Sequence, residues 1–110
     1  MKNHWIRMAR KRQFNRVEEF LNKNFAELLC SFGDQPGGGE KLFVKQSGLH
    51  ICTIIRNSEG WRICYYAGDR KNYRDEQLPG FNDPKFWGII LTAAQQSSSI
   101  MNKPETIIMK

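Results

Sequence analysis

The sequence predicts an α+β fold: a two-layer sandwich of helix, antiparallel sheet and helix, with three strands in the sheet, or four if residues near Tyr73 also pair. Three observations predict it: an apolar stripe at helical spacing between residues 14 and 29, strand-like alternation between residues 41 and 67, and a helix start signal at Asp83. The 110 residues suffice for one modest core, so residues 1–110 are expected to form a single domain.

The first helix is predicted from apolar residues that recur at steps of three and four. These residues are Phe14, Val17, Phe20, Leu21, Phe25, Leu28 and Leu29. The helix is expected to end near Cys30 or Ser31 and to stop at Gly33, and the glycine-rich residues 34–39 are expected to form a loop. Residues 1–13 form either a basic N-terminal arm or the first turns of this helix.

Three strands are predicted next, because short turns separate runs of β-branched and aromatic residues. They cover residues 41–46, 49–56 and 61–67. If residues 57–60 make an even-length hairpin loop, Arg56 faces Trp61 and Cys52 faces Tyr65, so that Cys64 points to the opposite face. A slip of one residue would instead bring the two cysteines together, and both registers stay open.

The second helix has the clearest start in the chain. Asp83 is a good N-cap, and Pro84 occupies the first helical position, where a missing N–H costs nothing. Trp87, Ile90 and Leu91 begin its buried stripe, and residues 102–104 stop it. Residues 103–110 are then a C-terminal tail, or they contain an edge strand at residues 106–109.

The order helix, three strands, helix resembles that of the double-stranded RNA-binding domain. That family carries a cluster of lysines at the start of its second helix, where this sequence reads Asp83-Pro84-Lys85-Phe86-Trp87, with a single lysine. The resemblance is one of topology, and a topology of this kind serves many functions.

Positive charge is concentrated at the N-terminus. Residues 1–24 carry seven basic and two acidic groups, whereas the other 86 residues carry ten basic and nine acidic groups. Such a segment attracts nucleic acid or an acidic protein, although a solvated helix face is the plain alternative. The candidate phosphate-binding residues are Lys2, Arg7, Arg10, Lys11, Arg12 and Arg16.

A second candidate surface interleaves aromatic and basic residues after residue 60. Aromatic faces stack on nucleobases or line a pocket, and guanidinium groups hold phosphates, although alternation must turn half of the strand aromatics into the core. The candidates are the aromatic residues Trp61, Tyr65, Tyr66, Tyr73 and Trp87 and the basic residues Arg62, Arg70, Lys71 and Arg74.

No catalytic residue, metal site or cofactor is predicted. His50, Cys52 and Cys64 lack the close Cys or His pairs of zinc sites, and nothing orients a cysteine–histidine pair for catalysis. Three cysteines are too few for a disulfide scaffold. With no apolar run long enough for a membrane span and no signal-peptide pattern, we expect a cytoplasmic protein.

These observations favour a small non-catalytic binding module that associates with nucleic acid through its basic N-terminal segment. One alternative is a protein-interaction module such as an adaptor, an inhibitor or an immunity-like protein, and another is a small-molecule-binding domain with an aromatic pocket. Because helices on one face leave the other sheet face partly apolar, we also expect a homodimer. Its rival is a monomer whose residues Trp5, Ile6 and Met8 fold over that face.

Overall fold

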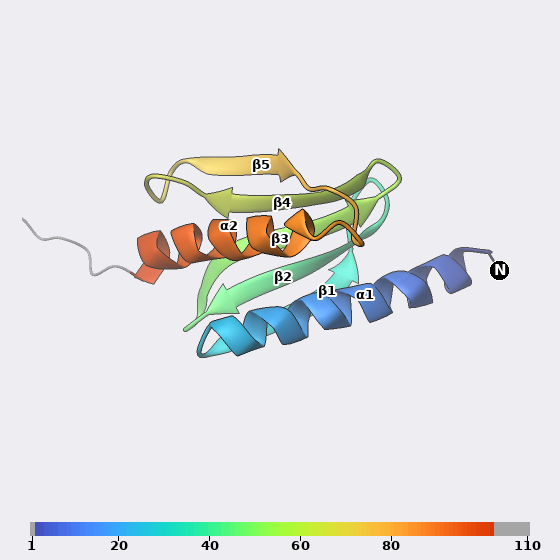
Figure 1. Ribbon diagram of the computed structural model, residues 1–110, viewed down its shortest axis with the longest axis horizontal. Helices are drawn as coiled ribbons and strands as arrows, with labels where there is room; N and C mark the ends of the chain where they lie inside the picture. The colour runs from blue at the N-terminus through green and yellow to red at the C-terminus, as the bar shows by residue number, and fades with distance from the viewer. Residues whose placement is uncertain (1, 103–110) are drawn as a thin grey trace, which may run out of the picture.

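The computed structural model describes residues 2–102, with side chains from His4 onward. Two helices and five antiparallel strands form two layers, and the strands follow one another across the sheet in chain order (Figure 1). The elements are α1 (Lys2–Asn24), β1 (Leu28–Asp34), β2 (Glu40–Gln46), β3 (Leu49–Asn57), β4 (Gly60–Tyr66), β5 (Tyr73–Gln77) and α2 (Lys85–Asn102). The predicted α+β class is confirmed, but the sheet has five strands rather than three or four.

Both helices pack against the same face of the sheet. Helix α1 contacts β1 and β2, and α2 contacts β3 and β4. Neither helix has the length and hydropathy needed to cross a membrane, as far as the chain is described. Trp5, Ile6 and Met8 are exposed on α1, so they do not cover the second sheet face as the rival to the expected homodimer required. The C-terminal tail or edge strand predicted for residues 103–110 lies outside the described residues.

The largest error of the sequence interpretation concerns the end of the first helix. Helix α1 ends at Asn24, and the predicted last helical turns form β1 instead, with Gly33 inside the strand. Glu27 has a φ of 60°, which no continuing helix allows, and its carbonyl accepts a hydrogen bond from the Ser47 N–H at 3.1 Å. Leu28 and Leu29 fit a helical spacing, but the strand alternates partly buried and exposed positions.

Other predicted elements hold, with their registers now fixed. Cys52 pairs with Tyr65 and Arg56 with Trp61, so the even-loop alternative is confirmed, and Cys52 and Cys64 point to opposite faces. The optional strand near Tyr73 is β5. With β1 added as well, the order no longer matches that of the double-stranded RNA-binding domain. Residues 2–13 belong to α1 rather than to a separate arm.

Trp61 joins the two helices to the sheet. Its side chain is 4% exposed, and its ring centroid lies 4.9 Å from that of Phe14 on α1 and 5.2 Å from that of Phe86 on α2. Phe81, in the connection before α2, stacks on the same indole at 5.5 Å. Aromatic rings at these separations add to the free energy gained by burial, so this cluster is the centre of the core.

A β-bulge in β3 changes which side chains face away from the helices. Val44 pairs with Cys52 but Lys45 pairs with His50, which leaves Ile51 as the extra residue. The buried Ser97 hydroxyl on α2 donates to the Ile51 carbonyl and accepts a hydrogen bond from the Tyr66 N–H at 2.8 Å. The Ile51 carbonyl and the Tyr66 N–H therefore both have a hydrogen-bond partner in the helix layer.

Replacing Ser97 with alanine should destabilise the protein, because the Ile51 carbonyl and the Tyr66 N–H lose their shared partner. We expect the free energy of unfolding to fall by about 1–3 kcal/mol, measured by chemical denaturation. Ser99→Ala, at an exposed position of the same helix, is the matched control and should change little. Equal stability of the two variants would contradict this role of Ser97.

Candidate binding site on the uncovered sheet face

Within residues 2–102, no element covers the sheet face opposite the helices, here called the uncovered face. Two cross-strand rows lie on it, and the pairing register defines them. One row consists of Lys41, Ile55, Arg62 and Gln77, and the other of Phe43, Thr53, Cys64 and Asp75. Tyr66 and Tyr73 pair at one end of the face. The face therefore combines apolar, aromatic and charged side chains.

Four rings gather on this face and are here called the aromatic cluster: Phe43, His50, Tyr66 and Tyr73. Phe43 and His50 stack with their ring centroids 4.3 Å apart and their planes at 17°. Tyr66 and Tyr73 lie 4.8 Å apart, and His50 lies 5.8 Å and 6.0 Å from these two rings. Three adjacent hairpins thus contribute to one continuous aromatic surface.

The bulge makes His50 part of the cluster. His50 and Thr53 are three residues apart, yet His50 Nε2 lies 2.7 Å from Thr53 Oγ1, because the extra residue turns both side chains to one face. His50 Nδ1 lies 3.3 Å from the Tyr66 hydroxyl. Both ring nitrogens therefore have partners, and the imidazole plane is fixed.

Two members of the cluster, His50 and Tyr73, are uncharged at neutral pH. Burial lowers the pKa of His50 below its ordinary 6.5, and Lys45 lowers it further, although a backbone hydrogen bond at Cys52 opposes them. Burial also raises the pKa of Tyr73 to about 12, although its side chain is still 48% exposed overall. These two rings therefore present neutral faces to a ligand.

Positive charge borders the cluster on β2. Lys41, Phe43 and Lys45 occupy alternate positions of this strand, so all three side chains project from the uncovered face. Lys45 is exposed and Lys41 is partly exposed. Arg62 already has partners on the same face, since it donates to Asp75 at 2.7 Å and to Gln77 at 2.9 Å. The two lysines are thus the cations on this face most open to a ligand.

The structure separates the predicted aromatic candidates. Tyr66 and Tyr73 come together on the uncovered face. Trp61 is in the core, Trp87 packs on Phe20 with ring centroids 5.1 Å apart, and Tyr65 is 6% exposed on the helix side. Phe43 and His50 were not among the predicted site residues. The alternation of β2 could have identified Phe43 as a residue of the same face as Lys41 and Lys45, whereas His50 reaches this face only because of the bulge.

The basic candidates on α1 lie in the helix layer, on the other side of the sheet. Arg7 forms an ion pair with Asp34, and Arg10 forms one with Glu40 at 3.1 Å. Lys11 lies 5.0 Å above the Phe32 ring, and Arg16 lies 5.3 Å from the Phe81 ring. Arg12 is exposed, and the side chain of Lys2 lies outside the described part of the chain. The expected polyanion surface is therefore partly neutralised by the fold itself.

The basic candidates after residue 60 are also spread out. Arg70 donates to the Met101 carbonyl at 3.1 Å, and Lys71 is exposed in the connection between β4 and β5. Arg74 pairs across the sheet with Tyr65, on the helix side. The structure does not bring these residues and Arg62 into one patch.

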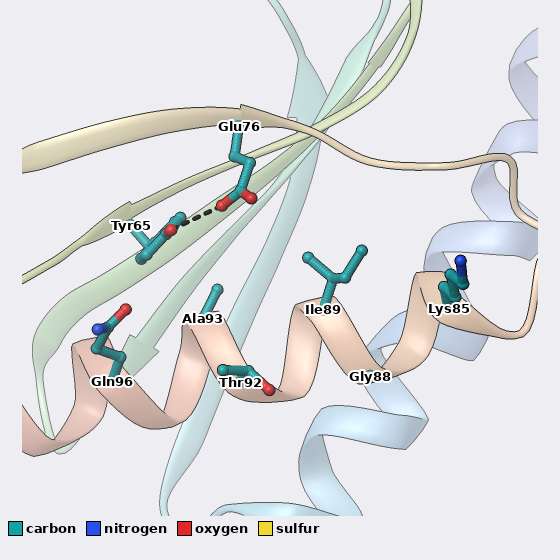
Figure 2. A pocket seen from close by; sticks show the side chains of 8 residues that line it. All are labelled: Tyr65, Glu76, Lys85, Gly88, Ile89, Thr92, Ala93 and Gln96. Carbon is teal, nitrogen blue, oxygen red and sulfur yellow. Dashed lines mark hydrogen bonds between the residues drawn. The ribbon is translucent and has the colours of Figure 1, made fainter.

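A groove of about 510 Å³ runs between α2 and the strands β4 and β5. Tyr65 and Glu76 project into it from the sheet, opposite Ile89, Ala93 and Gln96 of α2 (Figure 2). The Tyr65 hydroxyl donates to Glu76 at 2.7 Å, so both polar groups already have a partner. Of the aromatic residues expected to line a small-molecule pocket, this groove contains Tyr65 alone.

Residues 2–102 contain no group of three or more His, Cys, Asp or Glu side chains that could hold a metal ion.

His50 gives the fold a specific pH dependence. Because the folded state holds the pKa of His50 below 6.5, the unfolded chain binds this proton more readily, and stability is lost as the pH falls below 6.5. His50→Phe keeps a ring but removes the titration. We expect the variant to lose less stability than the wild type between pH 7.5 and 5, measured by urea denaturation at each pH; equal losses would contradict the buried neutral imidazole.

The comparisons with known proteins add no relative to this picture. No protein-family model, no curated protein and no solved structure matches the chain. What the protein does must therefore be argued from the uncovered face and its surroundings.

Proposed function

We propose that this protein is a non-catalytic binding module that takes single-stranded nucleic acid on its uncovered sheet face. The proposal rests on the aromatic cluster together with two lysines of β2. Lys41 and Lys45 lie on either side of Phe43 on the same face of this strand. Proteins that hold single strands combine stacking rings with cations that follow the backbone.

The aromatic cluster suits unpaired bases. Every nucleobase has a flat face, and stacking on an aromatic ring is worth about 1–3 kcal/mol per base without regard to sequence. Phe43 is partly exposed and Tyr73 is exposed. His50 contacts both of these rings and lies within hydrogen-bond distance of Tyr66, which orders the cluster. A ring surface that is already ordered loses little conformational entropy on binding.

Phosphate groups find their counter-charges on β2. Lys41 and Lys45 lie four residues apart on one strand face, which places them about 13 Å apart, with Phe43 between them. A strand crossing β2 can therefore stack a base while its phosphates approach a lysine. A duplex fits this face less well, since its bases are hidden and the flat sheet offers no helix to a groove.

The protein-interaction alternative uses the same surface. The uncovered face includes Ile55 and the exposed Leu29, and such residues also pack against a protein partner. The aromatic cluster with flanking lysines is the feature that favours nucleic acid over this alternative. Oligonucleotide binding distinguishes the two.

Tyr73→Ala should weaken binding of a fluorescently labelled oligothymidylate of about 12 nucleotides by roughly 5-fold to 150-fold, the loss of one stacked base. Combined Lys41→Gln and Lys45→Gln should weaken binding and reduce its salt dependence. Fluorescence anisotropy titrations at two salt concentrations measure both effects, and circular dichroism checks that each variant folds.

The control variant carries Arg12→Glu and Arg16→Glu on α1, in the other layer. It should lose less affinity than Tyr73→Ala and the double lysine variant, because it alters only the long-range field of the protein. If this variant lost binding while Tyr73→Ala bound normally, the ligand site would be on the basic helix. Absence of any oligonucleotide binding by the wild type would contradict the proposal and favour a protein partner.

A further inference from the structure

We propose that the β1 edge of the sheet pairs antiparallel with β1 of a second copy of this chain, about a two-fold axis at Ser31. The two sheets would then form one continuous sheet, with all four helices on one side. This inference stands on the edge strand itself and does not depend on the ligand proposed above.

The two edges of the sheet differ in how well they resist pairing. β5 has five residues, all exposed, and its centre reads Arg74-Asp75-Glu76. Charged side chains and short length are common protections of an edge strand. β1 has seven residues, and its single charged residue, Asp34, stands at its end. The β1 edge therefore lacks the protection that β5 has.

The free backbone groups of β1 are in a register that fits a two-fold axis at Ser31. The Gln35 N–H donates to the Gly39 carbonyl at 3.0 Å, and the Ser47 N–H donates to the Glu27 carbonyl at 3.1 Å. Antiparallel alternation then directs the odd-numbered residues of β1 toward β2, and the even-numbered ones outward. An axis at Ser31 brings Cys30 opposite Phe32 of the second copy, and both residues present outward N–H and carbonyl groups.

Charges on α1 favour the same axis. Lys11 Nζ lies 5.0 Å from the Phe32 ring, one residue to one side of Ser31. Cys30 is one residue to the other side of Ser31, and its thiol lies within the electrostatic influence of Glu18. Burial and, to a smaller extent, the Glu18 carboxylate raise the pKa of this thiol to about 12. Lys11 and Glu18 are seven residues apart, so they share a face of α1.

The two-fold axis makes these charges complementary. In each copy Lys11 is near Phe32 and Glu18 is near Cys30. Because Cys30 of one copy would pair with Phe32 of the other, Glu18 of each copy would lie at the same level as Lys11 of the other copy. Two symmetric ion pairs would therefore flank the strand pair. In the same register Leu29, which is 66% exposed, lies opposite Gly33, where open space surrounds the missing side chain. The pairing would cover the most exposed leucine of the sheet.

A disulfide tests the axis directly. Ser31 would face its own copy in a non-hydrogen-bonded pair, with the two Cα atoms about 4.5 Å apart, within the range that a disulfide spans. Ser31→Cys should therefore form a covalent dimer under mild oxidation on a non-reducing gel. Ser58→Cys, at an exposed turn position, is the matched control, and neither it nor the wild type should form a covalent dimer on that gel.

Charge exchange tests the interface without a new covalent bond. Lys11→Glu and Glu18→Lys should each weaken the dimer by about tenfold, because two symmetric attractions become repulsions. The combined Lys11→Glu/Glu18→Lys variant should restore it. Sedimentation equilibrium measures the dissociation constant, with a dimer mass of twice 12.9 kDa.

A wild-type mass of 12.9 kDa at every concentration would overturn the inference. So would equal crosslinking of Ser31→Cys and Ser58→Cys, or a combined charge variant no stronger than the single ones. Oligonucleotide affinity is not a readout in any of these experiments, so their failure would leave the proposed ligand site untouched.

Discussion

The packing around Trp61 is the interaction on which the arrangement of the whole molecule depends. Its indole contacts Phe14 of α1, Phe86 of α2 and Phe81 of the connection between β5 and α2. Helices that share one aromatic anchor on β4 must lie on the same side of the sheet. The position of Trp61 therefore decides that one face is core and that the opposite face is left to other contacts.

That opposite face is ordered in spite of having no covering layer. Buried Ser97 supports the Ile51 bulge from the helix side, and the bulge turns His50 into contact with Phe43 and Tyr66. The Ser97 hydroxyl group thus links the helix layer to the strand segment that positions the candidate site. A surface whose rings are held in this way is well suited to binding flat ligands, because little ordering remains to be done when the ligand arrives.

The parts of the fold that could be predicted from sequence are those set by local patterns. Alternation gave the three central strands, and Asp83-Pro84 gave the start of α2, where the helix begins at Lys85. Residues 25–31 were wrongly assigned to the first helix, because the spacing of Phe25, Leu28 and Leu29 fits a helix as well as a strand, and pairing with β2 decides between them.

The site was harder to predict, because contacts between distant residues define it. Tyr66 and Tyr73 were recognised as candidates, but His50 depends on a bulge that no sequence pattern marks. The ion pairs of Arg7 and Arg10 join residues 27 and 30 positions apart, so the sequence alone could not show that these cations already have partners. Net charge indicated a polyanion ligand without indicating which face would receive it.

Chemical-shift mapping by NMR shows directly whether a ligand binds on the uncovered face. On addition of an oligothymidylate of about 12 nucleotides to the isotope-labelled protein, we expect the largest shifts at the ring and amide resonances of Phe43, Tyr66 and Tyr73, with α1 nearly unchanged. Largest shifts at Arg12 and Arg16, with the aromatic cluster unperturbed, would contradict it.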